Sequence, residues 1–172
     1  MMNFFRVITI AAGLAIISLS ASAQNDDEVI SYRGRGYRGN VAFTDQYLVW
    51  MGFDTSHGYM FNEHHYLGAG AGLFLAPIYE LPAFGHVFLD YHAYFQKKKS
   101  TPMAGIKAGY CFSIGSHAGN VFDKSFEIEP CVGWNWSLSS NRGLNLSLGA
   151  SVFVYGENKA VAMPKVSFAF EF

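Results

Sequence analysis

The stretch "FEIEPCVGWNWSL", residues 126 to 138, alternates strictly between apolar and polar positions. Successive side chains of a β-strand point to opposite faces, so this stretch predicts a strand with two unlike faces. One face carries Phe126, Ile128, Pro130, Val132, Trp134, Trp136 and Leu138, and the other carries Glu127, Glu129, Cys131, Gly133, Asn135 and Ser137. The pattern does not yet say which face lies inside the protein.

The same period of two recurs along the chain. Seven further segments follow it, at about 37–44, 49–61, 65–75, 87–95, 104–114, 144–154 and 163–172. Tight polar turns such as "FNEHH", "QKKKST" and "SSNRG" alternate with somewhat longer connections. Short turns at one end and longer loops at the other are typical of membrane barrels. We therefore predict an all-β fold for residues 37–172, an eight-stranded antiparallel up-and-down transmembrane β-barrel.

The composition indicates which face meets lipid. Charged residues make up 15% of the chain and aromatic residues 17%, whereas soluble domains carry about 25% charged residues. A soluble sandwich or a lipocalin-like barrel would need a charged exterior, and this chain lacks the charges to cover one. The apolar faces should point to lipid, and Trp50, Trp134 and Trp136 should supply aromatic girdles at the interfaces.

The first 23 residues have the features of an export signal. Arg6 precedes the apolar run "VITIAAGLAIISL", and the small residues "ASA" end at Ala23. We expect residues 1–23 to be a cleaved signal peptide, because the run is short for a retained membrane helix, which needs about 20 residues. Residues 24–36 are expected to form a flexible lead-in. The net charge of −1 gives no reason to expect a nucleic-acid partner.

Two motifs resemble those of a known class of proteins. The alternation of Val166, Phe168, Phe170 and Phe172 resembles the C-terminal insertion signal of bacterial outer-membrane barrels, although an ordinary amphipathic strand would look similar. "HGYMFNEHHYLGAGAGL" and "GLNLSLGAS" resemble small eight-stranded barrels of the OmpA and OmpW types. The resemblance implies a monomer in the outer membrane of a Gram-negative bacterium, with membrane lipid and the barrel-assembly machinery as partners.

Charged residues on the inferred inner faces should form a polar network that fills the lumen, because buried charges must be paired. Its expected members are Asp90, His92, Lys107, Glu127, Glu129, Lys165 and Glu171. We expect Lys107 to pair with Asp90, Glu127 or Glu129.

A lumen filled by this polar network favours a structural or surface-interaction role in the envelope. An outer-membrane enzyme acting on lipid is the first alternative, with Ser113, Ser147 or Ser151 as nucleophile, but no spacing singles out one serine and one histidine. A narrow channel for small hydrophobic molecules is the second. No cofactor is expected. No metal is expected either, because the adjacent His64 and His65 point to opposite faces of a strand.

The two cysteines left after export, Cys111 and Cys131, lie on inner faces of consecutive strands. A hairpin centred near residue 121 would place them opposite each other and permit a disulfide, whereas a register shift of two residues would forbid it. Opposed Cβ atoms lie about 4.5–5.5 Å apart, and a disulfide prefers about 3.5–4.5 Å. The alternative is two free, buried thiols.

Overall fold

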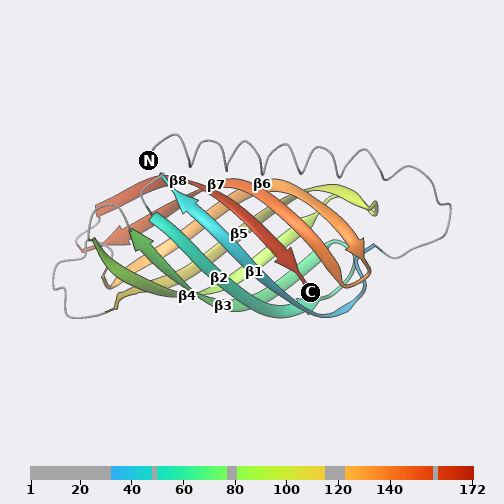
Figure 1. Cartoon of the computed structure of the whole chain (residues 1–172), viewed down its shortest axis with the longest axis horizontal. Coiled ribbons are helices and arrows are strands. Elements are labelled where there is room, and N and C mark those ends of the chain that lie inside the picture. Colours follow the sequence, from blue (N-terminus) through green and yellow to red (C-terminus); the bar gives the residue numbers. More distant parts are fainter. Residues whose placement is uncertain (1–31, 48–49, 77–80, 115–122, 157–158) are drawn as a thin grey trace. The chain divides into compact units, whose positions relative to one another are not determined.

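The computed structural model describes residues 32–47, 50–76, 81–114, 123–156 and 159–172. Eight antiparallel strands form a closed barrel in sequence order, and β1 pairs with β8 to close it (Figure 1). The strands are β1 (Gly36–Gln46), β2 (Trp50–Met60), β3 (His65–Ala76), β4 (Leu81–Tyr94), β5 (Ser100–Ser113), β6 (Ser125–Ser139), β7 (Arg142–Tyr155) and β8 (Lys159–Glu171). The predicted fold class is confirmed.

The strands extend further than the alternation predicted. Strand β4 begins six residues before the expected start at residue 87, and β5 and β8 each begin four residues early. The extra residues include Gly85 and Pro102, which interrupt the alternating pattern of the sequence but are paired with the neighbouring strands. No helix among the described residues is long and apolar enough to cross a membrane.

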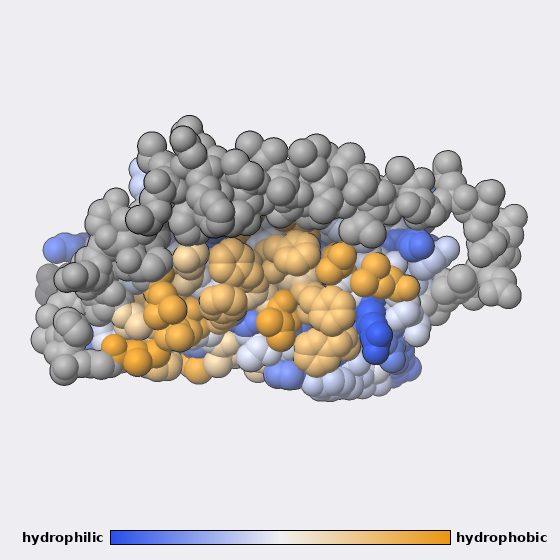
Figure 2. Space-filling view, viewed as in Figure 1, coloured by the Kyte–Doolittle hydropathy of each residue, from blue (hydrophilic) through white to orange (hydrophobic). Residues whose placement is uncertain are grey.

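Apolar side chains cover the outside of the barrel. Leu89 and Val132 are 62% and 65% exposed, and Figure 2 shows a broad area of hydrophobic side chains with more hydrophilic ones at its right-hand end. Aromatic pairs such as Phe43 and Phe53, with ring centroids 5.3 Å apart, lie on this surface. The apolar faces of the strands therefore point outward, as the composition indicated.

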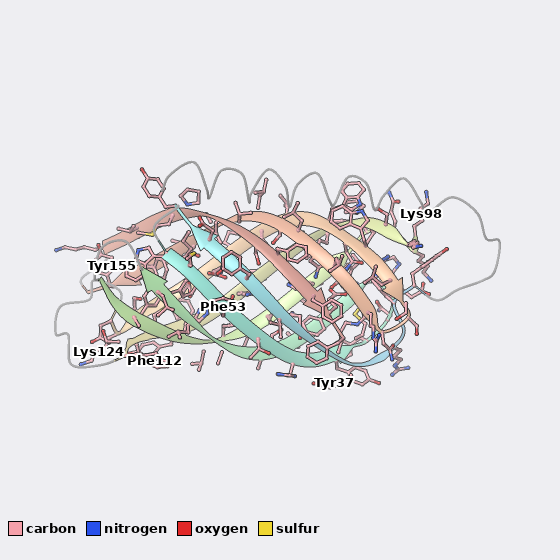
Figure 3. All side chains as sticks on the ribbon, viewed as in Figure 1. Tyr37, Phe53, Lys98, Phe112, Lys124 and Tyr155 are labelled. Atoms are coloured by element: carbon pink, nitrogen blue, oxygen red, sulfur yellow. The ribbon has the colours of Figure 1, made fainter. Side chains whose placement is uncertain are left out.

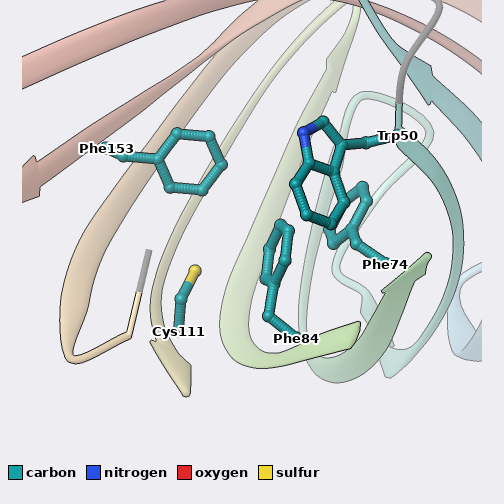
Figure 4. Packing of buried hydrophobic residues seen from close by; sticks show 5 residues of the cluster. All are labelled: Trp50, Phe74, Phe84, Cys111 and Phe153. Atoms are coloured by element: carbon teal, nitrogen blue, oxygen red, sulfur yellow. The ribbon is translucent and has the colours of Figure 1, made fainter. Parts of the chain in front are cut away.

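Trp50 does not belong to an outer girdle. It points inward, is only 6% exposed, and packs against Phe74, Phe84, Cys111 and Phe153 (Figure 4). Its ring meets that of Phe84 edge-on, with centroids 5.1 Å apart. The prediction for Trp50 was wrong. Trp50 is the first residue of β2 and lies an even number of residues from Asp54, so both side chains point inward. The irregular pattern of residues 49–61 concealed this alternation. We call these five residues the aromatic cluster.

The opposite end of the barrel carries both the start of β1 and the end of β8. The turns at residues 61–64, 95–99 and 140–141 lie at this end, and Figure 3 places Tyr37 and Lys98 here, away from Lys124 and Tyr155. A second inward cluster of Met60, Tyr66, Tyr94 and Met103 lies near it. The two apolar clusters therefore bound the interior at its two ends.

The expected lead-in at 24–36 is corrected in its last residues. Gly36 already belongs to β1, and the Arg33 side chain is 1% exposed. Its guanidinium donates to Asn135 Oδ1 at 2.7 Å, Ser137 Oγ at 3.0 Å and the carbonyls of Gln96 and Lys98 at 2.8 and 2.6 Å. A side chain with this many partners fixes its segment in place. The signal peptide at 1–23 and residues 24–31 lie outside the described residues.

The register of the β5–β6 hairpin decides between the two alternatives for the cysteines. Cys111 lies opposite Ser125, and Cys131 lies opposite Gly105. The thiols are thus six residues apart along the hairpin, or about 20 Å at the rise of a strand, and both are free. The sequence could not fix the register because the loop of residues 115–124 had no turn signal that set its centre.

We predict that both thiols react when the protein is unfolded without a reducing agent. The register separates them far beyond disulfide reach, so unfolding alone should expose two thiols per chain. Mass spectrometry after alkylation in denaturant measures the number. A chain that takes up label only after reduction would contradict the register.

Candidate functional site: the charged interior of the barrel

The inward faces between the two apolar clusters carry a concentrated set of charges. All seven residues predicted for the network point inward. Six of them are buried, and the Lys107 side chain is 15% exposed. They come from β4 (Asp90, His92), β5 (Lys107), β6 (Glu127, Glu129) and β8 (Lys165, Glu171). The structure distributes them over several connected groups.

Glu129 and Lys165 form the most direct pair. The Lys165 ammonium lies 2.6 Å and 2.8 Å from the two oxygens of Glu129. The Ser151 hydroxyl donates to the same carboxylate at 2.7 Å and accepts from the Gln46 amide at 2.7 Å. A buried ion pair is tolerated only when further hydrogen bonds satisfy its atoms, and this pair has them.

Lys107 pairs with a residue that the sequence analysis missed. Its ammonium lies 2.7 Å from Asp54 Oδ2, on a strand that is not adjacent to its own in the barrel. The expected direct partners Asp90, Glu127 and Glu129 do not contact it at that distance among the described contacts. The two side chains meet across the lumen, so the partner of Lys107 could not be found by considering neighbouring strands alone. The inward parity of Asp54 with Ser56 would have identified it.

His86 connects two carboxylates and was also missed, because it lies one residue before the strand expected at 87–95. Its Nε2 lies 2.9 Å from Asp54 Oδ1 and its Nδ1 lies 2.8 Å from Glu127 Oε2. Gly72 makes room for this arrangement, since a Cβ there would overlap both Asp54 and His86. Cys111 Sγ lies 3.4 Å from the same Glu127 oxygen.

Asp90 and His92 form another group. His92 Nε2 lies 3.0 Å from Asp90 Oδ1, and Ser56 Oγ donates to Asp90 Oδ2 at 2.7 Å. Ser56 Oγ also lies 2.9 Å from the Tyr66 hydroxyl. The polar network therefore continues into the cluster of Met60, Tyr66, Tyr94 and Met103 without a break.

Glu171 and Arg33 satisfy the polar groups at the end of the barrel where the chain ends. Glu171 accepts from Arg38 at 2.9 Å, Tyr94 at 2.5 Å and Asn145 at 2.7 Å. Arg33 lies over the Tyr94 ring, 5.2 Å from its centroid. Burial lowers the pKa of the Arg33 guanidinium from its ordinary value, but its carbonyl and amide partners favour the charged form.

A small cavity lies beside the charged residues of the polar network. Its volume is about 40 Å³, enough for about three water molecules. Small residues line it, among them Ala42, Ser147, Gly149 and Ser167, together with Lys107 and Lys165. Ligand pockets usually measure about 300–1,000 Å³, so this cavity has the size of a hydration site.

The serines considered as nucleophiles are not assembled with a base. Ser151 is fully buried and bonded to Glu129, and Ser147 lines the small cavity. Among the described contacts, no histidine ring nitrogen meets the hydroxyl of Ser113, Ser147 or Ser151. Both nitrogens of His86 face carboxylates instead.

The four residues of the expected insertion signal lie together on the outside of β8. Val166, Phe168, Phe170 and Phe172 are 39–44% exposed. Phe172 exchanges two backbone hydrogen bonds with Gly39 of β1, at 2.8 and 2.9 Å. Its ring lies over Gly39, where a Cβ would meet it. The last residue therefore takes part in closing the barrel.

The chain matches no family model and no curated protein. Solved structures do resemble it. The N-terminal β-barrel domain of Pseudomonas aeruginosa OprF aligns with 16% identity and a TM-score of 0.57, over 80% of this chain and 97% of that domain. Neisserial surface protein A aligns with 13% identity and a TM-score of 0.57, over 80% and 94%.

A designed transmembrane β-barrel is also similar. It aligns with 12% identity and a TM-score of 0.54, over 81% of this chain and 95% of the design. At these identities the likeness concerns the backbone alone. It agrees with the closed strand order and the apolar exterior described above. The chain has the fold of the small eight-stranded transmembrane β-barrels.

Proposed function

We propose that the chain is a monomeric outer-membrane protein whose lumen is filled and does not conduct, with a structural or surface-contact role in the envelope. The observation that carries the proposal is the order of side chains along the interior. Along the barrel, the aromatic cluster is followed by the charged residues of the polar network and then by the second apolar cluster. Arg33 lies at the end of the barrel beyond that second cluster. Eight strands enclose little more space than side chains occupy.

The outer surface supports membrane lipid as the surrounding partner. Large apolar side chains are exposed on all eight strands, for example Phe53, Leu89 and Val132. In water such an area would promote association, whereas in a bilayer it is the surface that lipid tails contact. The low net charge supports no nucleic-acid partner.

The assembly route follows from the same surface. We propose that residues 1–23 direct export and are removed, and that the barrel-assembly machinery recognises the outward face of β8. Val166, Phe168, Phe170 and Phe172 make a continuous apolar row there. Phe172 lies where β8 meets β1, the pairing that closes the barrel.

The two alternatives receive less support. A lipid hydrolase would need a serine within hydrogen-bond reach of a histidine, and the described contacts contain no such pair for Ser113, Ser147 or Ser151. A channel for small hydrophobic molecules would need a continuous passage, but the cavity of about 40 Å³ lies beside charged side chains. The filled barrel remains the better account.

The location can be tested in cells that express the full chain. We expect the protein in the outer-membrane fraction, soluble only in detergent, with a mature N-terminus at Gln24. On gels its migration should change on boiling, because a closed barrel resists unfolding by the gel detergent at room temperature. Recovery as a soluble periplasmic protein without detergent would refute the proposed function.

A further inference from the structure

Three side chains with metal-binding atoms converge inside the barrel, and one of them, Cys111, also belongs to the aromatic cluster. They are His86 of β4, Cys111 of β5 and Glu127 of β6. Cys111 is paired with His86 across one strand boundary, and its β6 partner Ser125 lies two residues from Glu127 on the same inward face. A ring nitrogen of His86, the thiol sulfur and a Glu127 oxygen all lie within 4.8 Å of one another, and Nδ1 is the nitrogen that faces Glu127.

The charge distribution leaves Glu127 without a lysine. Among the described contacts, Lys165 contacts Glu129, Lys107 contacts Asp54, and Glu127 meets only His86 as a basic group. Its second oxygen, Oε1, is buried and accepts from no donor in the described part of the chain, and the neighbouring group there is another carboxyl group, that of Glu129. A buried carboxylate without full compensation is costly. A cation at this point would supply the missing compensation.

We propose that His86 Nδ1, Cys111 Sγ and the Glu127 carboxylate bind a divalent, thiophilic transition metal, with Zn²⁺ as the ion that fits best. Thiolate, imidazole and carboxylate are the three side-chain ligands that Zn²⁺ takes in proteins, at about 2.0–2.3 Å. The thiolate disfavours Mg²⁺ and Ca²⁺, which prefer oxygen ligands. The second Glu127 oxygen or a water molecule completes the coordination.

The surroundings of His86 support a ligand role. A metal-binding histidine usually gives its other ring N–H to a carboxylate, which fixes its orientation. His86 Nε2 lies 2.9 Å from Asp54 Oδ1, and Asp54 is itself held by Lys107. Phe74 and Phe88 flank the imidazole, with ring centroids 4.9 and 4.8 Å away. The imidazole is therefore oriented before any ion arrives.

Both ring nitrogens of His86 face carboxylates, so the imidazole starts with a proton on each. The divalent ion replaces two protons, one from the Cys111 thiol and one from Nδ1, and both pass to solvent while Nε2 keeps its proton toward Asp54. The net charge of the interior is therefore unchanged. Figure 4 shows the Cys111 sulfur directed toward the space between Phe153 and Phe84. Because these rings cover the site on one side, the metal should enter while the barrel folds and exchange slowly afterwards.

The test uses the mature chain, refolded from urea into detergent with Co²⁺ as a spectroscopic probe and then freed of excess metal. We expect a near-ultraviolet thiolate-to-cobalt band, and one equivalent of cobalt by elemental analysis, in the wild type. The matched control is Cys131→Ser, which removes the other thiol, half-buried beside the small cavity, and should keep the band. Cys111→Ser, an isosteric change, should abolish it. Refolding with Zn²⁺ first should also suppress it.

A second variant separates metal binding from folding. Asp54→Asn should keep the thiolate band but need about 10–100-fold more metal to develop it during refolding. Gel migration before and after boiling shows which samples are folded, and only folded samples count. A folded wild type without the band, or a band that survives in Cys111→Ser, would overturn the proposal.

Discussion

Replacing Lys165 by methionine is expected to lower the free energy of unfolding by about 3–5 kcal/mol. The Lys165 ammonium contacts both oxygens of Glu129 and lies 3.7 Å from Asp54 Oδ2. Methionine fills a similar volume but leaves Glu129 as a buried charge with no cation in contact. Urea titration of the detergent-refolded barrel, followed by tryptophan fluorescence, measures the loss.

Two further variants isolate the contribution of the Lys165–Glu129 ion pair to the free energy of unfolding. Glu129→Gln alone should also destabilise, because it leaves the Lys165 charge buried. The double variant should lose less than the sum of the single losses, since no unpaired charge remains. Lys97→Ala is the surface control: Lys97 is 67% exposed beside Glu63, and such pairs contribute about 0–1 kcal/mol. Equal losses for Lys165→Met and Lys97→Ala would contradict a buried network.

Replacing Phe172 by aspartate is expected to remove most of the assembled barrel from cells while leaving export intact. The Phe172 ring lies on the outer surface beside His57 and Phe170, with centroids 6.2 and 6.4 Å away. A charge near the membrane interface costs about 1 kcal/mol or less. The folded barrel should therefore tolerate the change in detergent, and the loss in cells would come from poor recognition of β8 by the assembly machinery.

Comparing the amount assembled in cells with the stability of the purified protein separates a defect in recognition from a defect in folding. Phe61→Asp places the same charge in an exposed turn at the same end of the barrel and should assemble normally. Phe172→Leu should assemble like the wild type. Normal amounts of heat-modifiable barrel from Phe172→Asp would remove the basis for the insertion signal. An equally large loss of stability in detergent would instead assign the effect to folding.

The alternation of side chains was enough to predict the strands. Where the period of two was unbroken, as in β6 from Phe126 to Leu138, it gave the strand and separated its two faces. The low share of charged residues then indicated which face points outward. The inward charges Glu127, Glu129 and Lys165 followed from that parity. Parity is a local property of the backbone, so no distant information was needed.

Contacts across the lumen could not be predicted in the same way. The Lys107–Asp54 and His86–Asp54 contacts join strands that are not neighbours in sequence order, and they depend on the register of every hairpin between them. Arg33 was missed because a polar stretch before the first strand has no pattern that marks a buried side chain. The Cys111–Cys131 register depended on the centre of one loop.

The conductance of the purified wild-type barrel in a planar lipid bilayer tests the filled lumen most directly. The aromatic cluster, the charged side chains and Arg33 fill the described part of the interior beside a cavity of about 40 Å³, so we expect insertion without steps of ionic current. Insertion is verified independently by protease protection and heat-modifiable migration of the protein in the liposomes that deliver it to the planar bilayer. Regular, reproducible conductance steps from the correctly inserted wild type would contradict it.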